Sequence, residues 1–113
     1  MITNDEKYNE KDVLIAKFAK ALAHPARVQI VKFLASQKDC FCGNIVDYVP
    51  LSQSTVSQHL KELKEAGLIV GRYQPPKIYY CINKENWKIA KTLFDEIFAT
   101  NIDNICTTGD DKI

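Results

Sequence analysis

Hydrophobic residues recur at helical spacing along most of this 113-residue chain. Capping and breaking residues mark the ends of these periodic stretches. The residue before a proline disfavours helix, Ser52 can accept from an unpaired backbone N–H, and Gly67 can adopt a left-handed cap. The pattern predicts helices from Asp12 to about His24, from Pro25 to about Ser36, from about Asn44 to Tyr48, from Ser52 to about Ala66, and around Trp87, the last reaching roughly to Asp103.

Two β-rich stretches interrupt this helical pattern. Residues 68–74 and 77–82 are rich in β-branched and aromatic residues, and Pro75-Pro76 separates them, which predicts a hairpin. The resulting order, α-α-α-α-β-β-α, is that of a mainly α (α+β) winged helix-turn-helix. The length fits one domain over residues 1–113, with mobile tails at 1–9 and 107–113.

The predicted helix after Ser52 divides into an apolar side and a polar side. Val56, Leu60 and Leu63 form the apolar stripe. Gln can pair with an adenine edge, Ser can contact a base or a phosphate, and Lys suits a phosphate. The predicted DNA-binding residues on this helix are Ser52, Gln53, Ser54, Thr55, Ser57, Gln58 and Lys61. A capped, solvated helix face is an equally good interpretation of composition alone.

The distribution of charge supports a nucleic-acid partner. Net charge is only +1, yet residues 13–84 carry ten Lys and Arg against four Asp and Glu. A phosphate backbone responds to such a local excess. Arg72 and Lys77 flank the hairpin tip, where a wing would contact DNA, although such residues also protect exposed strand edges.

Two segments carry a family resemblance. Ala21-Leu22-Ala23-His24-Pro25-Ala26-Arg27-Val28-Gln29-Ile30 and Leu51-Ser52-Gln53-Ser54-Thr55-Val56-Ser57-Gln58-His59-Leu60 resemble the signature opening and recognition helix of the ArsR/SmtB metalloregulatory repressors. The resemblance implies a homodimer built from the first and last helices. It also implies binding of double-stranded operator DNA and release of that DNA when a metal or metalloid binds. Independently, the last helix is apolar over an arc wide enough to need a partner.

The cysteines are the candidate sensor. Cys40-Phe41-Cys42 resembles, by its place, the thiolate motif with which relatives bind arsenite, antimonite or soft divalent metals. Residues i and i+2 can grip one ion only where the backbone is extended or distorted. The relatives' third cysteine position holds Ile45 here, so Cys106 is predicted as the third sulfur, and Cys81 is expected to be a small strand filler. The predicted inducer is arsenite or antimonite, bound by Cys40, Cys42 and Cys106. Binding by Cys40 and Cys42 alone, with a third ligand from solvent or another thiol, stays open.

Other interpretations stay open. One is a thiol-redox regulator, in which either Cys40 or Cys42 pairs with Cys106, since a Cys40–Cys42 ring is unfavourable. A cadmium- or zinc-type sensor is less favoured: the N-terminal cysteine that cadmium-sensing relatives use is missing, and the last helix lacks the histidine of the zinc site. A protein-interaction module that does not bind DNA is a further alternative.

The expected location and chemistry follow from what the sequence lacks. The chain shows no signal peptide or apolar stretch of membrane-spanning length, so we expect a cytoplasmic protein with free thiols rather than disulfides, and no membrane partner. Catalytic motifs are missing, so we expect no enzyme. His24 is expected to cap a helix and His59 to be a packing residue.

Overall fold

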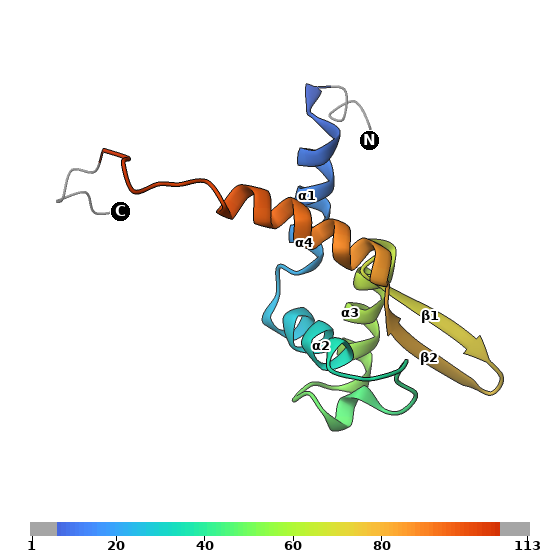
Figure 1. The fold of residues 1–113 in the computed structure, drawn as a ribbon. Helices are drawn as coiled ribbons and strands as arrows, with labels where there is room; N and C mark the ends of the chain where they lie inside the picture. Colours follow the sequence, from blue (N-terminus) through green and yellow to red (C-terminus); the bar gives the residue numbers. More distant parts are fainter. Residues whose placement is uncertain (1–6, 107–113) are drawn as a thin grey trace.

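The computed structural model describes residues 7–106, and this part of the chain contains four α-helices, one short 3-10 helix and one hairpin (Figure 1). The predicted winged helix-turn-helix is confirmed. The predicted tails lie outside the described residues except for 7–9. In order, the elements are α1 (Glu10–Ala21), α2 (Pro25–Ala35), η2 (Ile45–Asp47), α3 (Gln53–Glu65), β1 (Ile69–Gln74), β2 (Lys77–Ile82) and α4 (Lys84–Phe98).

Local capping explains most of the helix boundaries. Ser52 caps α3 through its side chain, and His24 caps α2, where its Nδ1 accepts from the backbone N–H of Ala26 at 3.0 Å. Gly67 has φ +85°, and Leu68 donates back to the carbonyl of Leu63, which ends α3 in the predicted left-handed cap.

Two elements differ from the prediction. The short helix is present but is a single 3-10 turn, and α4 ends at Phe98 rather than near Asp103. Beyond α4, the side chain of Asn101 accepts from the backbone N–H of Asp103 at 2.8 Å. Such a local bond competes with helical hydrogen bonding and disfavours continuation of the helix. The apolar pattern of the sequence continues beyond the end of α4.

The core lies between α1, α2, α3 and the base of the hairpin. The most deeply buried large side chains come from all four elements: Phe18, Ile30, Val56, Leu63 and Ile69. Asn86 on α4 donates to the carbonyl of Gly67 at 2.9 Å and so ties α4 to the turn that precedes the wing.

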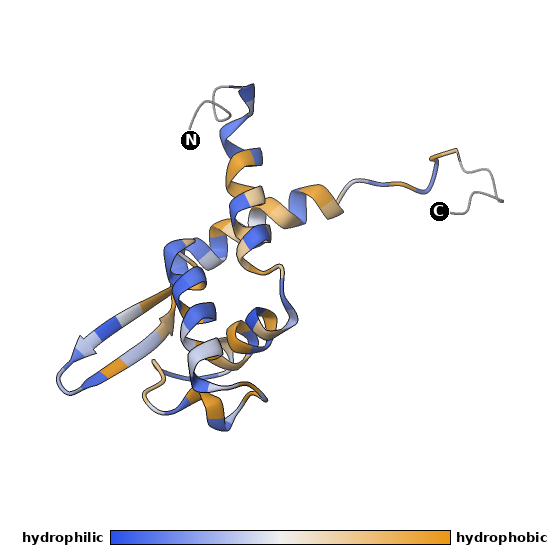
Figure 2. Ribbon diagram, turned by 180° about the vertical axis from the view of Figure 1, so that it is seen from behind, coloured by the Kyte–Doolittle hydropathy of each residue, from blue (hydrophilic) through white to orange (hydrophobic). Residues whose placement is uncertain are grey.

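Helices α1 and α4 pack against each other at one end of the domain, and the end of α4 projects beyond the body (Figure 1). In Figure 2 that projecting end is coloured as hydrophobic. Phe98 is 79% exposed and Ile97 is 47% exposed. No helix among residues 7–106 is long and apolar enough to cross a bilayer.

The hairpin extends from the opposite side of the domain. Its strands are antiparallel, with Ile69 opposite Ile82 at the base and Gln74 opposite Lys77 at the tip. Phe41, in the segment after α2, pairs with Tyr80 of β2 as an isolated bridge. The α2–η2 connection is therefore fastened to the returning strand of the wing.

Candidate nucleic-acid interface and its thiol bridge

The outward side of α3 is polar and accessible. Val56, Leu60 and Leu63 face the core, as predicted. The predicted DNA-binding residues on α3 lie on the other side or at its start: Ser52, Gln53, Ser54, Ser57, Gln58 and Lys61 are exposed, and Thr55 is half-buried.

Several of these side chains are held only loosely. Gln53 donates to Ser57 Oγ at 3.4 Å, and Gln58 donates to Glu62 Oε2 at 3.3 Å. Both bonds are longer than the usual 2.9–3.0 Å. The two amides can therefore exchange these partners for others at small cost. Ser52 differs, because its hydroxyl is used in the cap and bonds the Thr55 hydroxyl at 2.9 Å.

A cluster of basic side chains locks α3 onto the helices before it. Arg27 Nε donates to His59 Nδ1 at 3.0 Å, and its guanidinium also reaches the carbonyls of Lys20 and Ala21 at 3.4 Å. The ring of His24 lies 4.6 Å from that of His59. Arg27 thus joins the end of α1 to the recognition helix.

His59 is buried, as predicted for a packing histidine, and it also has a specific acceptor role. Burial lowers the pKa of His59, the nearby His24 and Arg27 lower it further, and Glu62 opposes them. The neutral imidazole keeps Nδ1 free to accept from Arg27.

The wing adds positive charge beside α3. Arg72 and Lys77 are exposed, Arg72 within β1 and Lys77 next to the Pro75-Pro76 tip. Lys64, on α3, lies over Gly71. If Gly71 carried a Cβ atom, that atom would be 3.6 Å from Lys64 Nζ. Lys64 is not among the predicted DNA-binding residues, although it follows Lys61 by three residues and so lies one helical turn further on.

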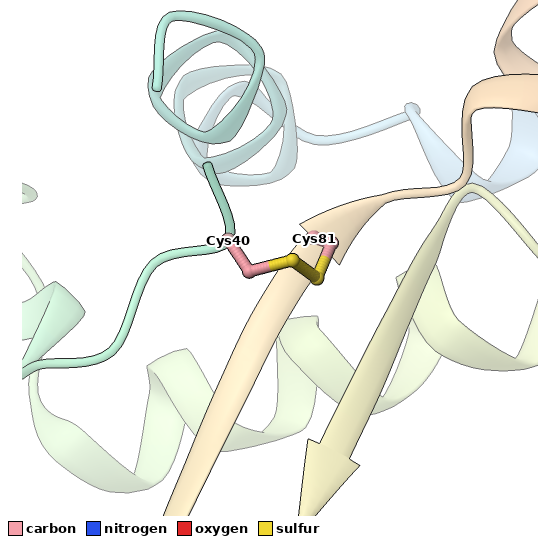
Figure 3. Close-up of a disulfide and its surroundings, with 2 residues drawn as sticks. All are labelled: Cys40 and Cys81. Atoms are coloured by element: carbon pink, nitrogen blue, oxygen red, sulfur yellow. A yellow bond between two sulfur atoms is a disulfide. The ribbon is translucent and has the colours of Figure 1, made fainter. Parts of the chain in front are cut away.

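Cys40 and Cys81 form a disulfide (Figure 3). Phe41 and Tyr80 exchange both backbone hydrogen bonds, at 2.8 and 2.9 Å, so the flanking pair Cys40 and Cys81 is a non-hydrogen-bonded pair. Opposed residues at such positions lie about 4.5 Å apart at Cα, and here the separation is 4.4 Å. The register of the bridge therefore brings the two sulfurs together.

This disulfide corrects two expectations. Cys81 is not a strand filler, because its sulfur is bonded to Cys40. The expectation of free thiols is wrong for the same pair and correct for Cys42, which is half-buried, and Cys106, which is exposed.

The predicted ligands Cys40, Cys42 and Cys106 are not brought together. Within residues 7–106 no three His, Cys, Asp or Glu side chains form a group that could hold a metal. Cys106 is exposed and follows α4 by eight positions. The described chain after α4 runs away from the body (Figure 1). A three-sulfur site of these cysteines stays a prediction for the reduced chain.

The disulfide encloses the whole candidate interface. All nine predicted DNA-binding residues lie between Cys40 and Cys81, which are 41 positions apart in sequence. An aromatic cluster anchors the Cys40 side of this loop: Phe33 stacks on Tyr48 at 4.6 Å and meets Phe41 edge-on at 4.8 Å. The covalent link therefore joins a fixed segment of the core to the wing.

A helix-turn-helix with an exposed polar recognition helix and a basic wing defines the class of winged-helix DNA-binding regulators. Sequence comparison agrees: the profile of the family described as "Bacterial regulatory protein, arsR family" matches residues 24–70. The chain belongs to the ArsR family of transcriptional regulators.

Two relatives illustrate the family, and one solved structure shares the fold. The uncharacterized HTH-type transcriptional regulator MJ1325 of Methanocaldococcus jannaschii is 34% identical over 81% of this chain and 99% of its own. The transcriptional repressor PagR of Bacillus anthracis is 41% identical over 60% of this chain and 68% of its own. An ArsR-like transcriptional regulator from Rhodococcus sp. RHA1 shares the fold with a TM-score of 0.64, 24% identity and coverage of 80% of this chain and 85% of that one. These relatives are regulators, not enzymes.

Proposed function

We propose that this chain is a homodimeric repressor that binds operator DNA through α3 and the wing. We also propose that it binds more tightly when Cys40 and Cys81 are joined than when they are reduced. The observation that carries the proposal is the position of the disulfide, which closes a loop around every predicted DNA contact. This is the thiol-redox alternative of the sequence analysis, with Cys81 in place of Cys106 as the partner.

The DNA-binding part rests on shape and charge. The exposed amides of Gln53 and Gln58 suit base edges in the major groove, while Lys61, Arg72 and Lys77 suit phosphates. Lys64 extends the same basic surface from α3 to β1. Such a surface predicts binding that weakens steeply with salt.

The dimer rests on exposed apolar residues that cover a wide arc of α4. Ile89, Ile97 and Phe98 are each more than a third exposed, and α1 packs beside them. A second copy would bury these residues and place two recognition helices on the two halves of a palindrome.

The sign of the redox effect follows from preorganisation. A flexible reading head must lose conformational freedom when it binds, and that loss weakens binding. The Cys40–Cys81 link restricts the segment that holds α3 and the hairpin before DNA arrives. Oxidation should therefore raise operator affinity, by about tenfold if about 1.4 kcal/mol of ordering cost is removed.

The test begins with selection of duplex DNA from a random pool by the oxidised chain. Affinity for the selected DNA is then measured for oxidised wild type, reduced wild type and Cys81→Ser. We expect reduction and Cys81→Ser to weaken binding equally, and Cys106→Ser, a free thiol outside the loop, to leave it unchanged. Failure to select any DNA would remove the DNA-binding proposal, and equal affinity in both redox states would remove the switch.

Arsenite or antimonite sensing is the second candidate. The oxidised chain does not fit either ion, because Cys40 and Cys81 carry no thiolate. Reduction would leave Cys42, two residues from Cys40, near two further thiols in the same register. The donor set would then be Cys40, Cys42 and Cys81, with Cys106 as the alternative third sulfur.

One substitution separates the two candidates. Release of DNA from the reduced chain by stoichiometric arsenite, lost in Cys42→Ser, would favour the metalloid sensor. Retention of DNA in the presence of arsenite, together with loss of DNA binding on reduction, would favour the redox switch. Cys42→Ser separates the two candidates because Cys42 has no part in the disulfide.

A further inference from the structure

A cavity lies directly beside the disulfide. Its volume is about 330 Å³, and both Cys40 and Cys81 line it. It lies between the end of α2, the base of β2 and the start of α4, and none of the nine predicted DNA-binding residues lines it. A cavity of this size is in the range that binds small ligands.

The wall of the cavity is basic. Lys38, Lys84 and Lys88 contribute to it, and Asp39 is the one acid among its lining residues. Lys84 and Lys88 share one face of α4, since they are four residues apart. Neither Lys84 nor Lys88 is held in an ion pair among residues 7–106. Positively charged side chains around one concavity attract an anion.

The cavity also has an apolar side. Leu34, Ile82 and Trp87 line it, and Trp87 is 37% exposed. A ligand that suits both sides has a short carbon skeleton and at least one carboxylate. The only reactive bond in the wall is the disulfide.

We propose that this cavity binds a small thiol that carries carboxylate groups and that this thiol reduces the Cys40–Cys81 bond. The ligand thiolate attacks one cysteine sulfur, forms a mixed disulfide with it and expels the other cysteine as a thiolate. A second ligand thiolate attacks the mixed disulfide and leaves as the ligand disulfide. Two ligand thiols are oxidised, one protein disulfide is reduced to two thiols, and the two protons pass from ligand to protein.

The regulatory role of this reaction rests on the proposed redox function. The inference adds the chemical class of the small molecule that would reduce the disulfide and so act as the inducer. The lysines raise the local concentration of an anionic thiol and hold its carboxylates, while the disulfide supplies the reacting group. The site is distinct from the DNA surface, so occupation of the cavity does not require DNA to leave first.

The experiment compares three small thiols of different charge. Reduction of the oxidised chain by 3-mercaptopropionate, 2-mercaptoethanol and cysteamine is followed, without DNA, by alkylation and mass measurement. Each rate is expressed per thiolate and divided by the rate of the same thiol with a small neutral disulfide, which removes differences in intrinsic reactivity. We expect the anionic thiol to exceed the neutral one by roughly threefold or more, and the cationic thiol to be the slowest.

Matched lysine variants test the origin of that preference. Lys84→Gln/Lys88→Gln should abolish the charge preference, whereas Lys17→Gln/Lys20→Gln, which removes the same charge away from the cavity, should keep it. Salt at about 1 M should reduce the preference, because these charges are exposed.

Equal normalised rates for the three thiols, or an unchanged preference in Lys84→Gln/Lys88→Gln, would overturn the proposal. Because the readout contains no DNA, such a failure leaves the effect of oxidation on operator affinity standing. Conversely, a charge preference that the cavity lysines control stands even if reduction does not alter DNA binding.

Discussion

Removal of the disulfide should destabilise the domain by an amount that its loop length sets. Cys40 and Cys81 are 41 positions apart. In the chain-entropy description, a cross-link of this span removes enough freedom from the unfolded chain to stabilise the fold by about 4 kcal/mol. This contribution acts on the unfolded chain and is separate from the restriction that the link places on the folded segment between Cys40 and Cys81.

The assay is urea unfolding at a fixed protein concentration, followed by the fluorescence of Trp87, which is the single tryptophan. At an m-value of about 1.5–2 kcal/mol/M, the expected loss moves the midpoint down by roughly 2 M or more. Reduced wild type and Cys81→Ser should unfold together, and Cys81→Ser should not respond to reductant. Cys42→Ser is the matched control, because Cys42 is a free thiol in the same segment.

Two results would refute this reasoning. One is an unchanged midpoint in reduced wild type after alkylation has shown that all four cysteines are free thiols. The other is a loss in oxidised Cys42→Ser as large as that in Cys81→Ser, which would place the effect in local packing rather than in the cross-link.

Three further predictions concern the interface, the buried histidine and the dimer. Lys61→Gln should weaken DNA binding and reduce the slope of log affinity against log salt by about 1. Lys17→Gln is the control and should leave that slope unchanged. An unaltered slope in Lys61→Gln would contradict a phosphate contact by Lys61. The lowered pKa of His59 means that the unfolded chain binds more protons than the folded chain, so the free energy of unfolding should fall as the pH drops below 6.5. Urea unfolding at several pH values should show that the free energy of unfolding depends less on pH in His59→Gln. Equal pH dependence in the two proteins would contradict that origin. If the proposed dimer forms, Phe98→Asp should convert it into a monomer in sedimentation and weaken operator binding at least tenfold. A dimer that persists in this variant would exclude this part of α4 from the interface.

Local signals in the sequence were sufficient for most of the fold. Pro25 begins α2, Ser52 caps α3 and Gly67 ends it, and each acts through its own backbone or that of close neighbours. The polar side of α3 also follows from its period, since the same spacing that buries Val56 and Leu63 exposes Gln53 and Gln58. The end of α4 was misplaced because the apolar pattern continues past the side-chain bond that stops the helix.

The thiol bridge could not be predicted, because it depends on a register between distant segments. The alternation Cys40-Phe41-Cys42 indicates extended backbone, but nothing local shows that Phe41 pairs with Tyr80. The same limit applies to Arg27 and His59, which are 32 residues apart and meet only after α2 and α3 have packed. An extended segment with a cysteine, together with a strand cysteine elsewhere, is the signal that would have justified testing this pairing.

The most direct test of the central claim measures the disulfide rather than the DNA. Coupling between two equilibria is reciprocal, so if oxidation tightens operator binding, operator binding must stabilise the Cys40–Cys81 bond by the same factor. The thiol–disulfide equilibrium of the chain is measured in a graded dithiothreitol buffer with the selected operator and with unrelated duplex. We predict that the operator makes the bond harder to reduce, by about 30 mV for each tenfold difference in affinity, and that unrelated duplex shifts the equilibrium much less. The same midpoint with operator and with unrelated duplex would contradict the claim that this bond controls how the chain binds DNA.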